Sequence, residues 1–162
     1  MADLYTQIQD EIAKYPDRRS AILPALRHAQ EHYGWLSPEA LENVADGLDL
    51  SPAHCLAVAS FYDMFFLQPV GDHVVEVCTN LSCALVGSDV VLRAFEQELG
   101  VVAPGTTADG KVTLRRVECL GGCGWGPVVS VDEEYQEHFK TEDIAPLISE
   151  LRATPRPSES HA

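Results

Sequence analysis

The spacing of apolar positions along the chain changes once, near residue 70. Before that point apolar residues recur three and four positions apart, as on one face of a helix, and strand-like alternation does not occur. The clearest set is Ala21, Ile22, Ala25, Leu26 and Ala29. We therefore expect a helical domain over residues 1–69.

Helix boundaries in this part can be placed from their caps. Ser37 and Ser51 each precede a proline, which pairs a capping hydroxyl with a residue suited to the first helical turn. Gly34 supplies a stop for an earlier helix, in which Pro24 marks either a kink or the true beginning. Several short helices are predicted.

The run Pro69-Val70-Gly71-Asp72 breaks this pattern, and short β-rich segments alternate with helical ones after it. Expected elements are strands at 73–77 and 112–117, a helix at 88–99 ended by Gly100, a hairpin of 128–131 with 135–139, and a helix at 141–151. This order suits helices packed on a mixed sheet in a thioredoxin-like arrangement. We expect an α+β or α/β chain with this second domain over 70–152 and a disordered tail over 153–162.

Charge and composition narrow the possible functions. The chain has 11 basic and 25 acidic residues and a formal net charge of −14, so binding to nucleic acid is not expected. No apolar run is long enough to cross a bilayer, so direct membrane insertion is not expected either. The first residues lack the features of a secretory signal, which indicates a reducing, cytoplasmic compartment.

Candidate chemistry centres on two cysteine pairs. Four residues separate Cys78 from Cys83, three separate Cys119 from Cys123, and 35 lie between the pairs. Each pair follows a predicted strand, so both are expected at the same end of adjacent parallel strands. Four thiolates suit either tetrahedral zinc or a two-iron cluster, and spacing alone does not choose between them or exclude disulfides.

The residues around the cysteines favour the cluster, which carries negative charge and needs N–H donors. Gly121, Gly122 and Gly124 can adopt positive φ and bring backbone amides close to sulfur, and Thr79 and Asn80 offer side-chain donors. The alternative is a tight turn that needs glycines whatever it binds.

Other features carry less information. Cys55 is predicted to be a buried apolar residue rather than a ligand. The aromatic run 61–66 is expected mainly in the helical core, with a partner-binding patch as the alternative. No glycine-rich dinucleotide fingerprint or phosphate loop occurs, so neither NADH nor flavin should bind to this chain alone.

Several of these motifs together resemble a known family. They are Ala59-Ser60-Phe61-Tyr62, Val77-Cys78-Thr79-Asn80-Leu81-Ser82-Cys83 and Val117-Glu118-Cys119-Leu120-Gly121-Gly122-Cys123-Gly124-Trp125-Gly126-Pro127. The resemblance is to the small [2Fe-2S] subunit of respiratory NADH:quinone oxidoreductase, called the E subunit in bacteria, and to its relatives in NAD-dependent formate dehydrogenases and bidirectional hydrogenases. Ser82 and Gly126 depart from the proline and alanine frequent in that family.

The resemblance implies a helical domain followed by a thioredoxin-like [2Fe-2S] ferredoxin domain, with one cluster held by Cys78, Cys83, Cys119 and Cys123. It implies single electrons taken from FMN in a larger NADH-binding subunit, with further iron–sulfur subunits nearby. FMN and NADH would bind only to that partner, and this chain would hold no catalytic residue. The assembly would lie at the cytoplasmic side of the inner membrane. A zinc-binding interaction module is the remaining alternative.

Overall fold

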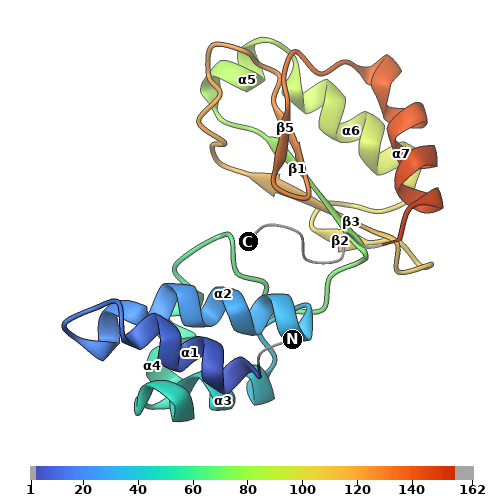
Figure 1. Cartoon of the computed structure of the whole chain (residues 1–162). Helices are drawn as coiled ribbons and strands as arrows, with labels where there is room; N and C mark the ends of the chain where they lie inside the picture. The colour runs from blue at the N-terminus through green and yellow to red at the C-terminus, as the bar shows by residue number, and fades with distance from the viewer. Residues whose placement is uncertain (1–2, 156–162) are drawn as a thin grey trace. The chain divides into compact units, whose positions relative to one another are not determined.

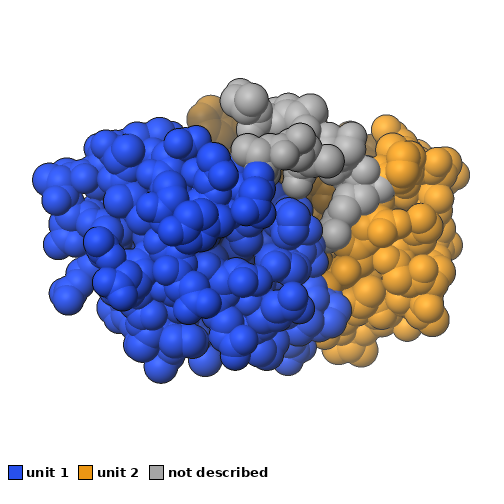
Figure 2. All heavy atoms as spheres, turned by 60° about the horizontal axis from the view of Figure 1, so that its bottom comes forward, with its two compact units in different colours: residues 1–69 blue, residues 70–162 orange. Residues whose placement is uncertain are grey.

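The computed structural model describes residues 3–155. The chain divides into two compact units, Met1–Pro69 and Val70–Ala162, which Figure 2 shows in different colours. The division falls in the breaker run Pro69–Asp72, where the apolar pattern changes. None of the helices in the described part is both long enough and apolar enough to cross a bilayer.

The first unit consists of short helices packed around an apolar core (Figure 1). Its elements are α1 (Leu4–Ile12), a 3₁₀ turn (Arg18–Ala21), α2 (Ile22–Tyr33), α3 (Pro38–Leu48) and α4 (Pro52–Ala59). The Ser37 and Ser51 hydroxyls accept hydrogen bonds from Ala40 N and His54 N, as the sequence predicts for N-caps. Pro24 lies in the first turn of α2, and Gly34 ends that helix at φ 79°.

An ion pair at the end of α1 makes this unit sensitive to acid. Lys14 Nζ donates to Glu11 Oε1 over 2.8 Å, and His28 Nε2 lies 3.2 Å from the same oxygen. The hydrogen bond from Lys14 is the main cause that holds the pKa of Glu11 below its ordinary value. The charged carboxylate therefore stabilises the fold above that ordinary value, and the contribution is lost as pH falls through the lowered pKa.

The Glu11→Gln variant tests this linkage. Because Lys14 is exposed to screening, we expect a loss of only about 0.5–1 kcal/mol in the free energy of unfolding at neutral pH. The difference from wild type should shrink as pH falls below about 4.5. Urea unfolding followed by Trp35 fluorescence in a Trp125→Phe background measures the first unit. A difference that stayed constant down to pH 3 would contradict the linkage.

The aromatic run 61–66 is mostly on the surface, and its expected place in the helical core was wrong. Phe61 is 80% exposed, and Tyr62 and Met64 are also exposed, whereas Phe65 alone in the run is buried. The reason is that α4 ends at Ala59, so the run does not continue a helix with one inward face. The run instead forms a turn with only Phe65 directed inward.

The second unit is a five-stranded mixed sheet with helices against it (Figure 1). Its strands are β1 (His73–Cys78), β2 (Gly105–Thr106), β3 (Val112–Val117), β4 (Val129–Val131) and β5 (Glu134–Gln136). Its helices are α5 (Leu81–Leu85), α6 (Ser88–Leu99), a 3₁₀ turn (Thr141–Asp143) and α7 (Ile144–Ala153). The strand order is β2-β3-β1-β4-β5, in which β1 and β3 are parallel and the other pairs antiparallel.

The core of this unit lies between one face of the sheet and the helices α6 and α7, which lie side by side in Figure 1. Val75 and Val77 of β1 face this core, whereas Glu76 faces the other way and pairs with Arg115 over 2.8 Å. Phe95 of α6 is fully buried and stacks on Phe139, with ring centroids 5.5 Å apart. The alternation along β1 thus separates an apolar face from a charged one.

Most expected elements of this unit are confirmed, with several differences. The helix expected from 141 begins as the 3₁₀ turn, and α7 starts at Ile144. The helix α5 and the two-residue strand β2 were not expected. The second arm of the hairpin begins at Glu134 and ends at Gln136, because the chain turns at Asp132 and Glu133, both with positive φ. Ala153 closes α7, so the helix passes the boundary expected at 152; residues 156–162 of the expected tail lie outside the described part.

Candidate metal centre

The sheet brings the two cysteine pairs to one edge. β1 and β3 run parallel in a register that places Cys78 opposite Val117. Cys78 is the last residue of β1, and Cys119 follows two residues after Val117, so both loops leave the same end of adjacent strands. This confirms the arrangement expected from the sequence, and it requires no contribution from the helical unit.

Cys83 is positioned by α5. The Asn80 carboxamide oxygen accepts a hydrogen bond of 2.7 Å from Leu81 N and caps this short helix, which turns Cys83 inward. Cys78 and Cys83 are both 2% exposed and pack with Val128. Gly126 lies against Cys83 so closely that a Cβ built on it would meet the Cys83 Sγ at 3.3 Å. These two thiols form the buried half of the site.

Cys119 and Cys123 form the exposed half, in a turn made by Gly121. The φ of Gly121 is 82°, a conformation that side chains rarely adopt, and its N–H points to the Cys119 Sγ at 3.3 Å. The two sulfur atoms are 3.9 Å apart, and all five cysteines are free. Both thiols are exposed.

The pKa shifts show that the thiols share one environment. Burial raises the pKa of Cys83, with smaller effects from Cys78 and Cys123, and a hydrogen bond from the Val128 backbone opposes the rise. The hydrogen bond with Cys119 is the main cause that raises the pKa of Cys123, and Cys78 adds to it. Crowded thiols resist becoming thiolates unless a cation compensates their charge, and iron or zinc ions supply that compensation.

The expected N–H donors divide into two groups. Gly121 donates to sulfur as predicted, whereas the Thr79 hydroxyl donates to the Val117 carbonyl over 3.2 Å, and the Asn80 oxygen caps α5. Positive φ occurs at Gly121 but not at Gly122 or Gly124. Gly122 is needed for space instead, because a Cβ there would lie 3.0 Å from a methyl group of Val128.

Two contacts were missed from the sequence. The backbone of Val128 hydrogen-bonds to Cys83, and the Cys78 thiol lies 3.8 Å from the Glu118 carbonyl. Backbone groups leave no signal in residue type, so only the fold reveals them. Gly126 was noted as a departure from a family pattern, but its contact with Cys83 was not predicted.

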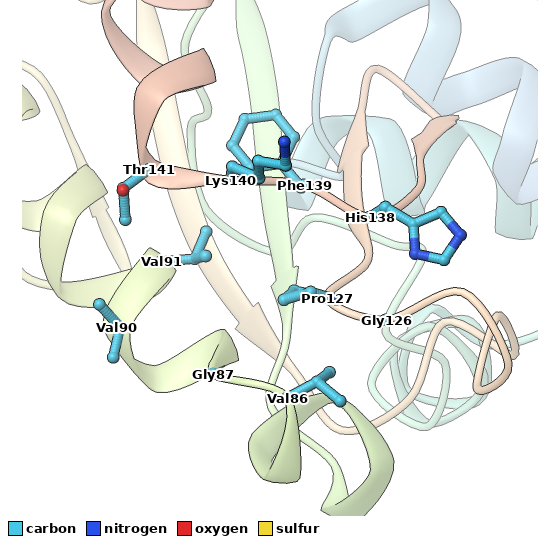
Figure 3. A pocket seen from close by; sticks show the side chains of 10 residues that line it. All are labelled: Val86, Gly87, Val90, Val91, Gly126, Pro127, His138, Phe139, Lys140 and Thr141. Carbon is cyan, nitrogen blue, oxygen red and sulfur yellow. The ribbon is translucent and has the colours of Figure 1, made fainter.

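Figure 3 shows a pocket of about 390 Å³ in the second unit. Val86 and Gly126 line it. A Cβ built on Gly126 would lie 3.0 Å from a methyl group of Val86 and 3.3 Å from the Cys83 Sγ. Val90, Pro127 and Phe139 extend the apolar lining, and Lys140 supplies a cation. Exposed apolar residues also occur around the cysteine loops, at Leu81, Leu85, Val86, Val90 and Trp125. We call these five residues the apolar collar.

Four thiols in two pairs suit the ligand set of a binuclear iron–sulfur cluster. Among residues 3–155, no three His, Cys, Asp or Glu side chains gather closely enough for a single ion. Such a cluster would be held by two thiolates on each iron. Two thiolates on one tetrahedral metal lie about 3.8 Å apart, which the Cys119–Cys123 pair matches at 3.9 Å. Cys55 is buried in the first unit and belongs to no such pair.

Comparison with known proteins agrees with this chemistry. The family model described as "Thioredoxin-like [2Fe-2S] ferredoxin" matches residues 8–152. The E-type NADH-quinone oxidoreductase subunit of Mycobacterium bovis is 41% identical over 96% of this chain, and this chain spans 62% of its length. One E-type NADH-quinone oxidoreductase subunit of Rhizobium meliloti is 39% identical over 93% of this chain and 89% of its own length.

A solved structure shares the fold. The NAD+-reducing [NiFe]-hydrogenase in the air-oxidized state superposes with a TM-score of 0.72 at 21% identity, over 82% of this chain and 23% of that one. The parallel pairing of β1 with β3, the two thiol pairs at one edge of the sheet and the family match over 8–152 lead to one conclusion. This chain belongs to the thioredoxin-like [2Fe-2S] ferredoxin family.

Proposed function

We propose that this chain is the [2Fe-2S] electron-transfer subunit of an NADH:quinone oxidoreductase. The observation that carries the proposal is identity of about 40% to curated E-type subunits across more than nine-tenths of the chain. In this role Cys78, Cys83, Cys119 and Cys123 ligate the single cluster. Single electrons come from FMN in a larger NADH-binding subunit, which also binds the NADH.

The protein side chains and backbone hold the site in place. When bound, the cluster supplies reversible one-electron chemistry. Cys78 and Cys83 would bind the cluster from the buried side, where the Val128 backbone supplies a hydrogen bond. Cys119 and Cys123 would bind it from the exposed side, where the Gly121 N–H points to sulfur. N–H groups directed at sulfur offset the negative charge that an added electron brings.

The apolar collar is the proposed docking surface for the flavin-containing partner. Exposed apolar side chains around a redox site exclude water when a partner covers them, and they place the exposed thiol pair next to that partner. Further iron–sulfur subunits belong to the same assembly. We propose that this assembly lies at the cytoplasmic side of the inner membrane and that this chain is attached there through other subunits.

A second candidate is the equivalent subunit of a bidirectional hydrogenase or an NAD-dependent formate dehydrogenase. The shared fold with a chain of an NAD+-reducing hydrogenase favours it, although at 21% identity. Each of these assemblies would use the four cysteines in the same way. The two candidates therefore differ in the partner subunits and not in the site itself.

Anaerobic purification of the tagged chain from its own cells tests both parts of the proposal. We expect brown-red protein with about two iron and two sulfide per chain, which becomes paramagnetic on one-electron reduction. Subunits that co-purify should oxidise NADH and lack hydrogenase and formate dehydrogenase activity. Colourless protein with about one zinc per chain would contradict the redox role and favour the zinc module.

A further inference from the structure

The helical unit has an apolar surface that its own core does not explain. In α4, His54 is the only polar side chain, and it is exposed, whereas only Cys55 and Ala59 are buried. Leu56 is therefore left 44% exposed on the outer face. A helix that is apolar on all sides is ordinarily covered on all sides.

The turn that follows α4 in the chain adds further exposed apolar residues. Phe61, Tyr62 and Met64 are exposed there, and Phe61 packs edge-on against Tyr62 with ring centroids 5.2 Å apart. Large exposed apolar patches mark binding surfaces on soluble proteins.

A groove of about 270 Å³ lies between α3 and α4 of the same unit. Leu41 of α3 and Leu56 of α4 form part of its walls, together with Leu36 and Leu67. Glu42 is the single charged residue among those that line it. The groove and the exposed turn 61–64 are hereafter called the α3–α4 surface.

The charge around the α3–α4 surface determines what can cover it. Helix α3 carries three exposed acidic residues, Glu39, Glu42 and Asp46. Asp49, directly after this helix, is already paired with Arg18 over 2.9 Å. A second copy of this chain would bring acidic residues against acidic residues, which is unfavourable in a self-complementary contact. A partner with lysine or arginine beside its apolar residues would be attracted.

We propose that the α3–α4 surface binds an amphipathic helix of a partner protein, with one apolar face and basic residues along its flanks. The apolar face fills the groove and covers Leu56 and Phe61, as in helix-in-groove recognition. The basic flanks lie against the acidic residues, among which Glu42 stands at the groove itself. This contact is separate from the cluster, so it goes beyond the proposed electron transfer.

Photo-cross-linking in cells that make the native partner subunits tests the occupant. The full-length chain carries p-benzoylphenylalanine in place of Phe61, and a control chain carries it in place of Tyr5, another exposed aromatic of the helical unit. We expect the probe at 61, but not the probe at 5, to label a peptide of a different protein. That peptide should have the apolar spacing of an amphipathic helix, with Lys or Arg beside the apolar face. Labelling of a second copy of this chain, or of a peptide without basic residues, would overturn the proposal.

Matched substitutions measure the strength of the contact. Phe61→Asp and Glu42→Lys should each reduce the partner retained on the tagged chain by about tenfold or more, whereas Tyr5→Asp should leave retention unchanged. Iron content should stay at the wild-type level in all three variants, because the four proposed ligand cysteines lie in the other unit. If the Phe61→Asp, Glu42→Lys and Tyr5→Asp variants retained equal amounts of the partner, the proposal would be overturned. A wild-type chain purified without iron would instead count against the redox role.

Discussion

The Cys78→Ala variant is expected to lose its visible absorption and to retain about tenfold less iron than wild type, or less still. Alanine offers no donor atom, and Cys78 sits at the buried end of β1, where no other cysteine can replace it without movement of the strand. Loss of groups that merely support a metal ligand already lowers affinity by about 10- to 100-fold, so loss of a ligand should cost at least as much. Iron and sulfide analysis of protein purified without oxygen measures the effect.

Cys55→Ala is the matched control. It removes the same atom from a buried cysteine, but in the helical unit, at a position outside the proposed ligand set. We expect full iron content and an unchanged spectrum of the reduced protein. If Cys78→Ala kept as much iron as Cys55→Ala, Cys78 would not be a ligand and the proposed set would be wrong.

Phe95→Ala is expected to produce the largest loss of stability in the second unit. Phe95 is fully buried between α6 and the sheet and stacks on Phe139. Removal of such a ring costs about 3–5 kcal/mol, from lost burial and from the cavity that remains. The urea concentration at which the cluster colour is lost should fall accordingly.

A smaller change at the same position provides the comparison. Phe95→Leu retains most of the apolar area and should lose less than about half as much stability as Phe95→Ala. Val102→Ala, at a position that is 77% exposed, should leave the midpoint unchanged. An equal midpoint for Phe95→Ala and Val102→Ala would show that this core does not support the cluster.

The parts of the fold that follow from periodicity were predicted well. The strand 112–117 and the helix 88–99 have the expected bounds, and Ser37 and Ser51 cap their helices. These elements carry their own signals, because alternation, helical spacing and capping residues depend on local sequence. The parallel placement of the cysteine pairs followed from the order of elements alone.

The parts that were missed depend on tertiary contacts. Helix α5 has only five residues, too few to establish a helical period, although it directs Cys83 inward. Thr79 was expected to donate a hydrogen bond to sulfur, but in the fold its hydroxyl donates to the Val117 carbonyl. The run 61–66 has the composition of a core segment, and only the end of α4 at Ala59 shows that most of it faces outward.

The position of β1 in the middle of the sheet has a consequence for reaction speed. β1 is hydrogen-bonded to β3 on one side and to β4 on the other, so the strand that ends in Cys78 has little freedom to shift. The carbonyl of Val128, next to β4, accepts a hydrogen bond from Cys78 N, so the end of β1 is also held from the side of β4. Such stiffness keeps the thiol framework nearly identical before and after an electron arrives, and a small rearrangement between oxidation states permits rapid exchange with a redox partner.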